Sequence, residues 1–274
     1  MTGGTRRGRV CGHVIWSLHV SMLFRELPYL RRQRAARDAG FDMVETWWPP
    51  RGVGRAWADA IGAQDLRVAS INAHAGDLEA GDRGFLNDAA RRDEAVGVFT
   101  DAVALARRAD CTHINVLAGR ELPGSSREEQ LHNVREALAR CAEVAEREQV
   151  TILVEPVNAL DSPGYLLPTP AAAAAMIEQI DSPHVRLLYD AYHAARAGLD
   201  PIAEVGEHAG LIGHVQYADC PGRGAPGTGD VDLGAFAAAL GAAGYDGPVG
   251  LEFDPGGPTR PALAMLPALP ALPV

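Results

Sequence analysis

The chain has 274 residues, of which 47% are hydrophobic and 22% are charged, a composition that excludes an intrinsically disordered protein. It carries 35 acidic and 25 basic side chains, for a formal net charge of −10, so we expect no binding to nucleic acid or to an anionic membrane. All of the basic residues are arginines, which excludes chemistry based on a Schiff-base lysine or a P-loop lysine.

Four cysteines lie far apart in the chain and form no C-x-x-C pair and no zinc-binding spacing: Cys11, Cys111, Cys141 and Cys220. We therefore expect reduced thiols and a cytoplasmic protein. No apolar run approaches the roughly 18 residues of a membrane span. The arginine-rich first residues lack the cleavage site of a signal peptide, so we expect no export signal.

Eight short, largely apolar runs predict β-strands that are covered on both faces, as in a parallel sheet. They span residues 14–20, 41–47, 66–73, 112–117, 151–155, 185–190, 211–217 and 248–253. The segments between them are mostly helical in pattern.

Apolar residues recur at helical spacing over residues 96–106 and again over residues 131–145. Thr169, which precedes a proline and five alanines, predicts the start of another helix. Asp232 predicts the cap of a later helix that Gly244 ends.

Eight strands that alternate with helices predict one α/β domain, most simply a closed (β/α)₈ TIM barrel over residues 10–255. A doubly wound sheet with extra strands is the alternative. Prolines recur through residues 256–274, and each proline inside a helix costs about 3 kcal/mol. We therefore expect an irregular Pro-rich C-terminal tail, with at most one or two helical turns, in place of a long eighth helix.

The last four predicted strands share one feature, because each of them finishes in an oxygen-bearing side chain: Glu155, Asp190, Gln216 and Glu252. Neighbouring strands lie about 4.8 Å apart and the carboxyl ends of barrel strands meet at one rim, so these side chains can converge. Three carboxylates in one place repel one another unless a cation or protons neutralise them. An all-oxygen set favours a hard divalent cation, Mg²⁺ or Mn²⁺, over zinc. The alternative is that each side chain caps its own loop.

Three further side chains are expected near this rim. His193 follows Asp190 by three residues, a spacing that places it on the loop over the metal site and predicts a functional role. His74 ends the third strand, where a binding role and a structural role are equally supported. Glu45 ends the second strand, and we interpret it as a supporting or structural residue.

Residues 222–227 read GRGAPG and match the G-x-G-x-x-G pattern of dinucleotide-binding loops. The internal proline and the late start of the next helix argue against a nicotinamide site. We interpret the segment as an anion-binding loop in which backbone N–H groups and Arg223 face a carboxylate or phosphate. A cluster of arginines at residues 31–37 is expected on the solvent-facing side of the first helix.

With these residues identified, the chain resembles the hydroxypyruvate isomerase family of the xylose isomerase-like TIM barrels, from about residue 18 to residue 255. Two pieces of the matching stretches, AGD and PGTG, are uncommon in the wider superfamily. All of the stretches that carry the resemblance lie at residues 20–28, 39–45, 75–84, 115–119, 155–158, 190–193, 214–219, 221–223, 226–229 and 244–247.

The resemblance implies a divalent metal bound by the four strand-end oxygens: Glu155, Asp190, Gln216 and Glu252. It implies that the two glutamates of this set transfer the proton. It also implies that His193 and Arg223 hold substrate oxygens, and we add His74 as a further candidate for substrate binding.

The activity implied by the resemblance is the interconversion of hydroxypyruvate and tartronate semialdehyde, an aldose–ketose type isomerisation. Its mechanism is metal-assisted proton transfer through an enediolate. Three features depart from the family pattern. Gly224 and Ala225 stand where His-Glu is usual, Asp230 stands where Glu is usual, and the Pro-rich tail replaces the eighth helix.

Other functions stay open. A 2-oxo-tetronate isomerase of the same family would use the same residues on a four-carbon sugar acid. A non-catalytic sugar-acid-binding barrel is a second alternative, although it does not need two glutamates as bases. The net charge argues against an endonuclease. The expected partner is a small 2-oxo or hydroxy acid, and self-association into a homo-oligomer stays open.

Overall fold

The computed structural model describes residues 15–270, and within this range eight parallel strands form a closed barrel in sequence order. The strands are β1 (Trp16–His19), β2 (Met43–Thr46), β3 (Arg67–Asn72), β4 (His113–Val116), β5 (Thr151–Val154), β6 (Val185–Asp190), β7 (Ile212–Tyr217) and β8 (Val249–Leu251). The eight predicted strands are therefore confirmed. Residues 10–14 of the predicted domain and Cys11 lie outside the described residues.

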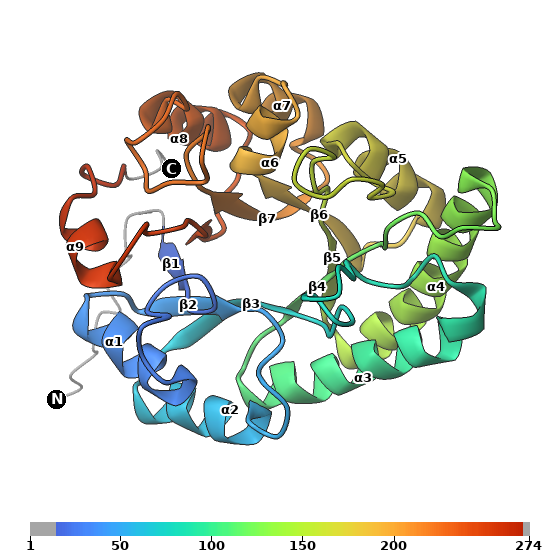
Figure 1. Cartoon of the computed structure of the whole chain (residues 1–274), viewed down its shortest axis with the longest axis horizontal. Helices are drawn as coiled ribbons and strands as arrows, with labels where there is room; N and C mark the ends of the chain where they lie inside the picture. Colours follow the sequence, from blue (N-terminus) through green and yellow to red (C-terminus); the bar gives the residue numbers. More distant parts are fainter. Residues whose placement is uncertain (1–14, 271–274) are drawn as a thin grey trace, which may run out of the picture.

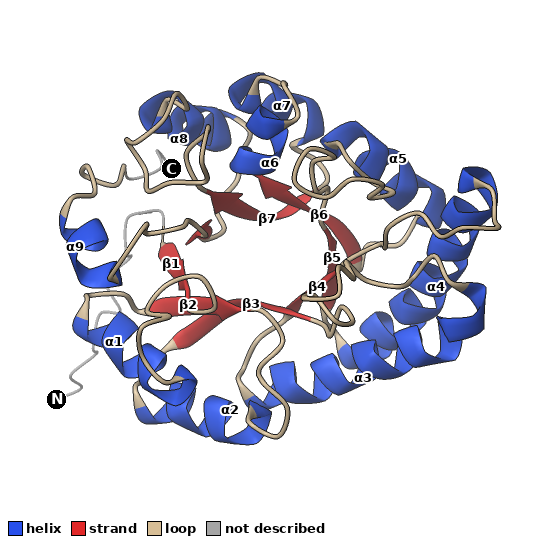
Figure 2. Ribbon diagram, in the orientation of Figure 1, coloured by secondary structure: helices blue, strands red, loops and turns tan. Residues whose placement is uncertain are grey.

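Pairing of the last strand with the first closes the barrel. Trp16 of β1 lies opposite Val249 of β8, and Leu18 lies opposite Leu251. Seen down its axis, the ring of strands is surrounded by helices on all sides (Figure 2). This closure confirms the TIM barrel and excludes the doubly wound sheet, which has two free edges.

The helices lie outside the strands in chain order around the ring (Figure 1). They are α1 (Arg32–Asp38), α2 (Gly54–Ala63), α3 (Arg92–Arg108), α4 (Arg127–Glu148), α5 (Pro170–Ile180), α6 (Ala191–Arg196), α7 (Pro201–His208), α8 (Leu233–Ala242) and α9 (Thr259–Ala264). Two short 3₁₀ segments, Tyr29–Arg31 and Ala89–Arg91, precede α1 and α3.

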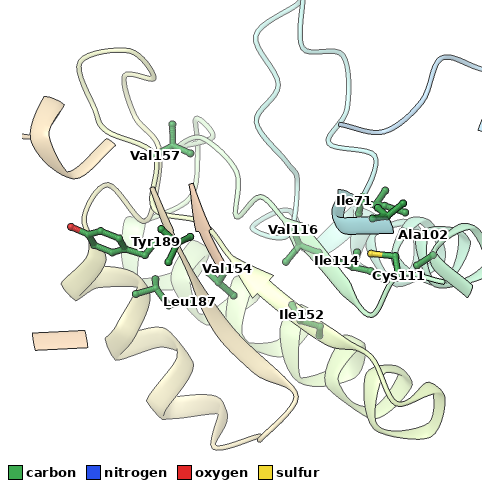
Figure 3. Packing of buried hydrophobic residues seen from close by; sticks show 14 of the residues in the cluster. Ile71, Ala102, Cys111, Ile114, Val116, Ile152, Val154, Val157, Leu187 and Tyr189 are labelled. Carbon is green, nitrogen blue, oxygen red and sulfur yellow. The ribbon is translucent and has the colours of Figure 1, made fainter. Parts of the chain in front are cut away.

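The two apolar stripes predicted from helical spacing lie in α3 and α4, on the sides that pack against the strands. Phe99 and Val103 of α3, and Val134 and Leu138 of α4, are buried in the core. Figure 3 shows Ala102 of α3 close to side chains of β3 and β4. Apolar burial between helices and strands therefore stabilises the barrel wall, at about 25 cal/mol per Å² removed from water.

The predicted helix starts are confirmed by their capping hydrogen bonds. The Thr169 side chain accepts from the backbone N–H of Ala172, and Asp232 accepts from that of Ala235. Gly244 has φ +74°, a left-handed conformation that favours glycine, two residues after the end of α8.

The arginine cluster lies mainly at the surface, as expected for a solvent-facing stripe. Arg34 pairs with Asp38, and Arg31 is exposed. Arg32 instead folds back toward the barrel, where its guanidinium donates to the carbonyl oxygens of Val20 and Leu27. One member of the cluster thus fastens the loop after β1.

After β8, within the described residues, the chain forms only the six-residue helix α9, which lies in the ring between α8 and α1 (Figure 1). The Thr259 side chain at the start of α9 is fully buried and accepts from the backbone N–H of Phe24. Farther along, the Pro270 carbonyl accepts from the Trp16 indole N–H at 3.3 Å. These contacts hold the described part of the Pro-rich segment against the barrel. The predicted domain boundary at residue 255 is not tested by them and stays a prediction. No helix within residues 15–270 is long and apolar enough to cross a membrane.

Candidate active site

The carboxyl ends of the strands open into a cavity of about 1110 Å³. Glu155 follows β5, Asp190 ends β6, Gln216 is the penultimate residue of β7 and Glu252 follows β8. All four are at most 6% exposed. Two of them, Glu155 and Glu252, line the cavity, together with Arg223. The structure therefore brings the predicted strand-end residues to one rim.

Glu155 and Asp190 lie on neighbouring strands with His193 between them. The Nε2 atom of His193 is 3.7 Å from Glu155 Oε1 and 3.7 Å from Asp190 Oδ2. On its other side, Glu155 Oε2 accepts a hydrogen bond of 2.6 Å from the Asn115 amide. Asp190 Oδ1 accepts from the backbone N–H of Tyr192, the first turn of α6. His193 itself lies in α6 and not in a loop as predicted.

The tautomer of His193 is fixed by Asn158. The backbone N–H of Asn158 points at Nδ1 of the imidazole at 3.4 Å, and the Asn158 amide nitrogen lies 2.7 Å from the same atom. Because Nδ1 accepts, the proton of the neutral ring resides on Nε2. Burial lowers the pKa of His193 to about 4, against the opposing charge of Asp190. His193 thus presents an N–H donor toward Glu155 and Asp190, whereas a metal-ligating Nε2 must be unprotonated.

Glu252 lies among donors. The Trp47 indole N–H donates to Glu252 Oε1 at 3.1 Å, and the Arg223 guanidinium lies 3.3 Å from the same oxygen. The same Arg223 nitrogen lies 3.6 Å from Asp190 Oδ2. Arg223 therefore lies between two of the carboxylates, and its 24% exposure leaves it accessible from the cavity.

The donor set fits a divalent cation. Asp190 Oδ2 and Gln216 Oε1 are buried oxygens with no hydrogen-bond partner among the described residues. The three carboxylates lie beside one guanidinium, so two negative charges remain when all three are ionised, and a divalent cation neutralises them. Oxygen ligands of this kind suit Mg²⁺ or Mn²⁺. Glu155, Asp190 and His193 have potential ligand atoms within 4.8 Å of one another. Because Nε2 of His193 carries a proton, the carboxylate oxygens are the better metal ligands of this group.

The buried carboxylates Glu155 and Glu45 have pKa values shifted in opposite directions. Burial and the neighbouring charges of Glu252 and Asp190 raise the pKa of Glu155 above its ordinary value. Burial acts on Glu45 in the same direction, but the charge and the hydrogen bond of His214 outweigh it and lower the pKa of Glu45 to about 2. Without a bound cation, these effects favour the protonated form of Glu155, whereas Glu45 stays ionised.

His74 lies apart from the buried cluster. It is exposed on the wall of the cavity, and its Nδ1 accepts from the backbone N–H of Gly76. This position can contact only the outer part of a bound molecule. A substrate-binding role for His74 stays a prediction.

The loop after β7 contains a buried carboxylate that accepts from one backbone N–H group of residues 222–227. Asp219 is fully buried, and its carboxylate accepts from the backbone N–H groups of Cys220, Gly227 and Val231 at 2.9–3.0 Å. Asp219 therefore organises the loop, and an anion-binding role for the other N–H groups of residues 222–227 stays a prediction. Arg223, with φ +54°, is the part of the loop that is directed to the cavity.

Three residues of the site were missed by sequence reasoning: Trp47, Asn115 and Asn158. Trp47 ends the second predicted strand and Asn115 lies in the fourth, so a search for polar atoms at every strand end would have included both. Asn158 lies in a loop, and no local pattern indicates its contact with His193.

Comparison with known proteins agrees with this geometry. Residues 33–269 match the family model described as xylose isomerase-like TIM barrel. The chain belongs to the xylose isomerase-like TIM barrel family. It is 36% identical to a candidate hydroxypyruvate isomerase of Streptomyces coelicolor, over 92% of this chain and 95% of that protein. It is 31% identical to the hydroxypyruvate isomerase of Escherichia coli, over 88% and 93%.

Other members of the xylose isomerase-like family are also similar to the chain. A 2-oxo-tetronate isomerase of Pectobacterium atrosepticum is 27% identical over 90% of this chain and 95% of that protein. A crystal structure titled AP endonuclease, family 2, from Brucella melitensis superposes with a TM-score of 0.87 at 29% identity, over 92% of this chain and 97% of that one. This xylose isomerase-like barrel is an isomerase.

Proposed function

We propose that this isomerase interconverts hydroxypyruvate and tartronate semialdehyde. Its curated relatives indicate a sugar-acid isomerase, and those with the highest identity carry the hydroxypyruvate isomerase name. The observation that carries the proposal is the pair Glu155 and Glu252, two buried carboxylates on the wall of one cavity. Two carboxylates that face the same substrate are what a proton transfer between adjacent carbons requires.

In this proposal one glutamate removes a proton from the hydroxymethyl carbon and the other adds a proton to the neighbouring carbonyl carbon. The hydroxyl proton passes between the two substrate oxygens, so the reaction leaves the composition unchanged. Arg223 pairs with the substrate carboxylate, because its guanidinium is accessible from the cavity. The Nε2–H of His193 donates to a substrate oxygen that lies between Glu155 and Asp190.

We propose that the four strand-end oxygens hold a divalent cation, Mg²⁺ or Mn²⁺, in the manner expected from the sequence. The supporting observations are the unpartnered oxygens of Asp190 and Gln216 and the excess of negative charge. When bound, such an ion supplies Lewis-acid stabilisation of the negative charge that develops on the substrate oxygens.

The decisive variant is Glu155→Gln, which keeps the size of the side chain and removes its capacity to carry a proton. We expect a folded protein whose turnover of hydroxypyruvate falls by at least about 100-fold, the typical contribution of general acid–base catalysis. Turnover is measured with Mn²⁺ present, and exchange of the substrate C–H in deuterated water is followed by NMR. Glu148→Gln, at a surface ion pair with Arg107, is the matched control and should retain full activity.

A second candidate is isomerisation of a four-carbon 2-oxo-tetronate. The similarity to a 2-oxo-tetronate isomerase and the size of the cavity, about 1110 Å³, favour it. Comparing kcat/KM for hydroxypyruvate and for 2-oxo-tetronates distinguishes the two substrates. If the wild-type protein exchanges no C–H with either acid, both isomerase proposals are wrong and a non-catalytic sugar-acid-binding barrel is favoured.

A further inference from the structure

Glu45 lies inside the barrel and contacts Gln216 of the proposed metal site, although it comes from the opposite side of the ring. It belongs to β2, and its side chain is fully buried. Its carboxylate fills the space beside Gly250 of β8, where an added Cβ would lie 1.6 Å from Glu45 Oε1. A side chain at position 250 would therefore exclude this arrangement.

The partners of Glu45 surround its carboxylate with donors. The hydroxyl groups of Ser17 and Ser70 donate to Oε1 at 2.8 Å and to Oε2 at 3.0 Å. The His214 Nε2 atom lies 2.9 Å from Oε2. Gln216 is the fourth partner, and its amide nitrogen donates to Oε2 at 3.0 Å. A carboxylate with these neighbours acts only as an acceptor.

This contact decides which way the Gln216 amide is turned. A glutamine amide has one oxygen and one nitrogen, so binding the nitrogen at Glu45 directs the oxygen to the other side. That oxygen, Oε1, is buried and has no partner among the described residues. In the strand register Gln216 lies opposite Asp190, whose Oδ2 is also buried without a hydrogen-bond partner among the described residues, with Arg223 at 3.6 Å.

We propose that Glu45 is a positioning residue that holds the Gln216 amide with its oxygen presented to a divalent cation. The inference rests on the proposed metal-dependent function and gives the supporting role expected of Glu45 a specific target, the Gln216 amide. Without an acceptor-only neighbour, the amide can rotate by half a turn and present its N–H₂ group to the cation. An amide nitrogen does not ligate Mg²⁺ or Mn²⁺, which take oxygen ligands.

The test is the Mn²⁺ affinity of the folded Glu45→Gln variant, measured by electron paramagnetic resonance of the free ion. Glutamine at position 45 offers both a donor and an acceptor, so the orientation of the Gln216 amide is no longer fixed. We expect the affinity to fall about 10- to 100-fold, the range found when a group that orients a metal ligand is removed. Ser70→Ala is the matched control, because it removes a donor to the same oxygen, Glu45 Oε2, and leaves the Gln216 contact in place; its affinity should stay near the wild-type value.

The double variant Glu45→Gln/Gln216→Glu exchanges the two groups, so that position 45 carries the amide and position 216 carries the carboxylate. The new carboxylate offers only oxygens to the cation, so we expect Mn²⁺ affinity to recover to at least the wild-type value. A role of Glu45 in folding alone predicts instead that the double variant is as poorly folded as Glu45→Gln, which circular dichroism checks. This variant also decides the matter if Glu45→Gln by itself does not fold.

The outcomes separate this inference from the proposed function. If the wild-type protein binds no Mn²⁺, the proposed metal site is wrong and this inference with it. If the wild-type protein binds Mn²⁺ and Glu45→Gln binds it equally well, only the role of Glu45 is wrong. A double variant that folds but does not bind Mn²⁺ would also overturn it.

Discussion

Trp47 combines two tasks at the mouth of the barrel. Its indole lines the cavity, and its N–H donates to Glu252 Oε1 at 3.1 Å. A hydrogen bond to a charged group is worth about 1.5–3 kcal/mol. Trp47 therefore restricts the orientation of a carboxylate that, in the proposed reaction, must face a substrate carbon.

Replacing Trp47 by phenylalanine removes this donor and keeps an apolar ring at the same place. We expect kcat to fall by about 10- to 100-fold with a small change in KM, because the hydrogen bond orients Glu252 and does not hold the substrate. Steady-state kinetics measure both constants, and circular dichroism checks the fold. Trp48→Phe is the control, since Trp48 lines the same cavity and its indole has no hydrogen bond in the described chain. Equal effects of the two substitutions would contradict a specific role for Trp47.

The loop between β7 and α8 is the element that places Arg223. It is organised by the buried Asp219 carboxylate, whose three backbone donors come from both ends of the loop. The departure from the family pattern at Gly224 also belongs to this loop. A Cβ at position 224 would lie 2.3 Å from Thr228 Oγ1, and the Gly224 carbonyl accepts from the backbone N–H of Asp219. The absence of a side chain at position 224 thus fits the tight path of the chain.

Asp219→Asn should loosen this loop, because an amide N–H₂ replaces one of the two acceptor oxygens and leaves a backbone N–H unpaired. We expect KM for the acid substrate to rise about tenfold or more as Arg223 loses its fixed position, while the melting temperature changes by only a few degrees. Kinetics and thermal melting test this together. Asp230→Asn, an exposed change in the same loop, should leave both nearly unchanged. An unaltered KM in Asp219→Asn would show that the loop holds Arg223 without this carboxylate.

At the scale of the whole molecule, the half-buried His113 makes stability depend on pH. Burial, with a smaller contribution from the nearby charge of His214, lowers the pKa of His113 to about 4. The unfolded chain takes up a proton below about pH 6.5, whereas the folded chain does so only near pH 4. The unfolded state therefore binds more protons between these values, and the free energy of unfolding falls as the pH decreases through this window.

We expect His113→Asn to flatten this acid dependence, since asparagine does not titrate. The slope of the unfolding free energy between pH 6.5 and pH 4 is measured by urea denaturation at several pH values. His132→Asn, at an exposed position on α4, serves as the control and should keep the wild-type slope. If His113→Asn keeps that slope too, other groups cause the acid sensitivity.

The strands could be predicted because their signal is local. Residues of β5 and β6 form short apolar runs, and the carboxylates that follow them, Glu155 and Asp190, interrupt the apolar pattern at the strand end. A parallel barrel places all such ends at one rim. The cap at Thr169 and the left-handed Gly244 are equally local, and both were predicted from neighbouring residues.

The sequence by itself thus determined the barrel, the order of its strands and the strand ends at which the carboxylates lie. Only the tertiary structure decided which atoms those carboxylates meet. Glu45 contacts Gln216 across 171 residues of chain, and Trp47 contacts Glu252 across 205. Such pairs depend on the register of the strands and on the closure of the ring. Hydrophobic periodicity records which face of a strand is buried, but it does not record which side chains then meet inside a closed barrel.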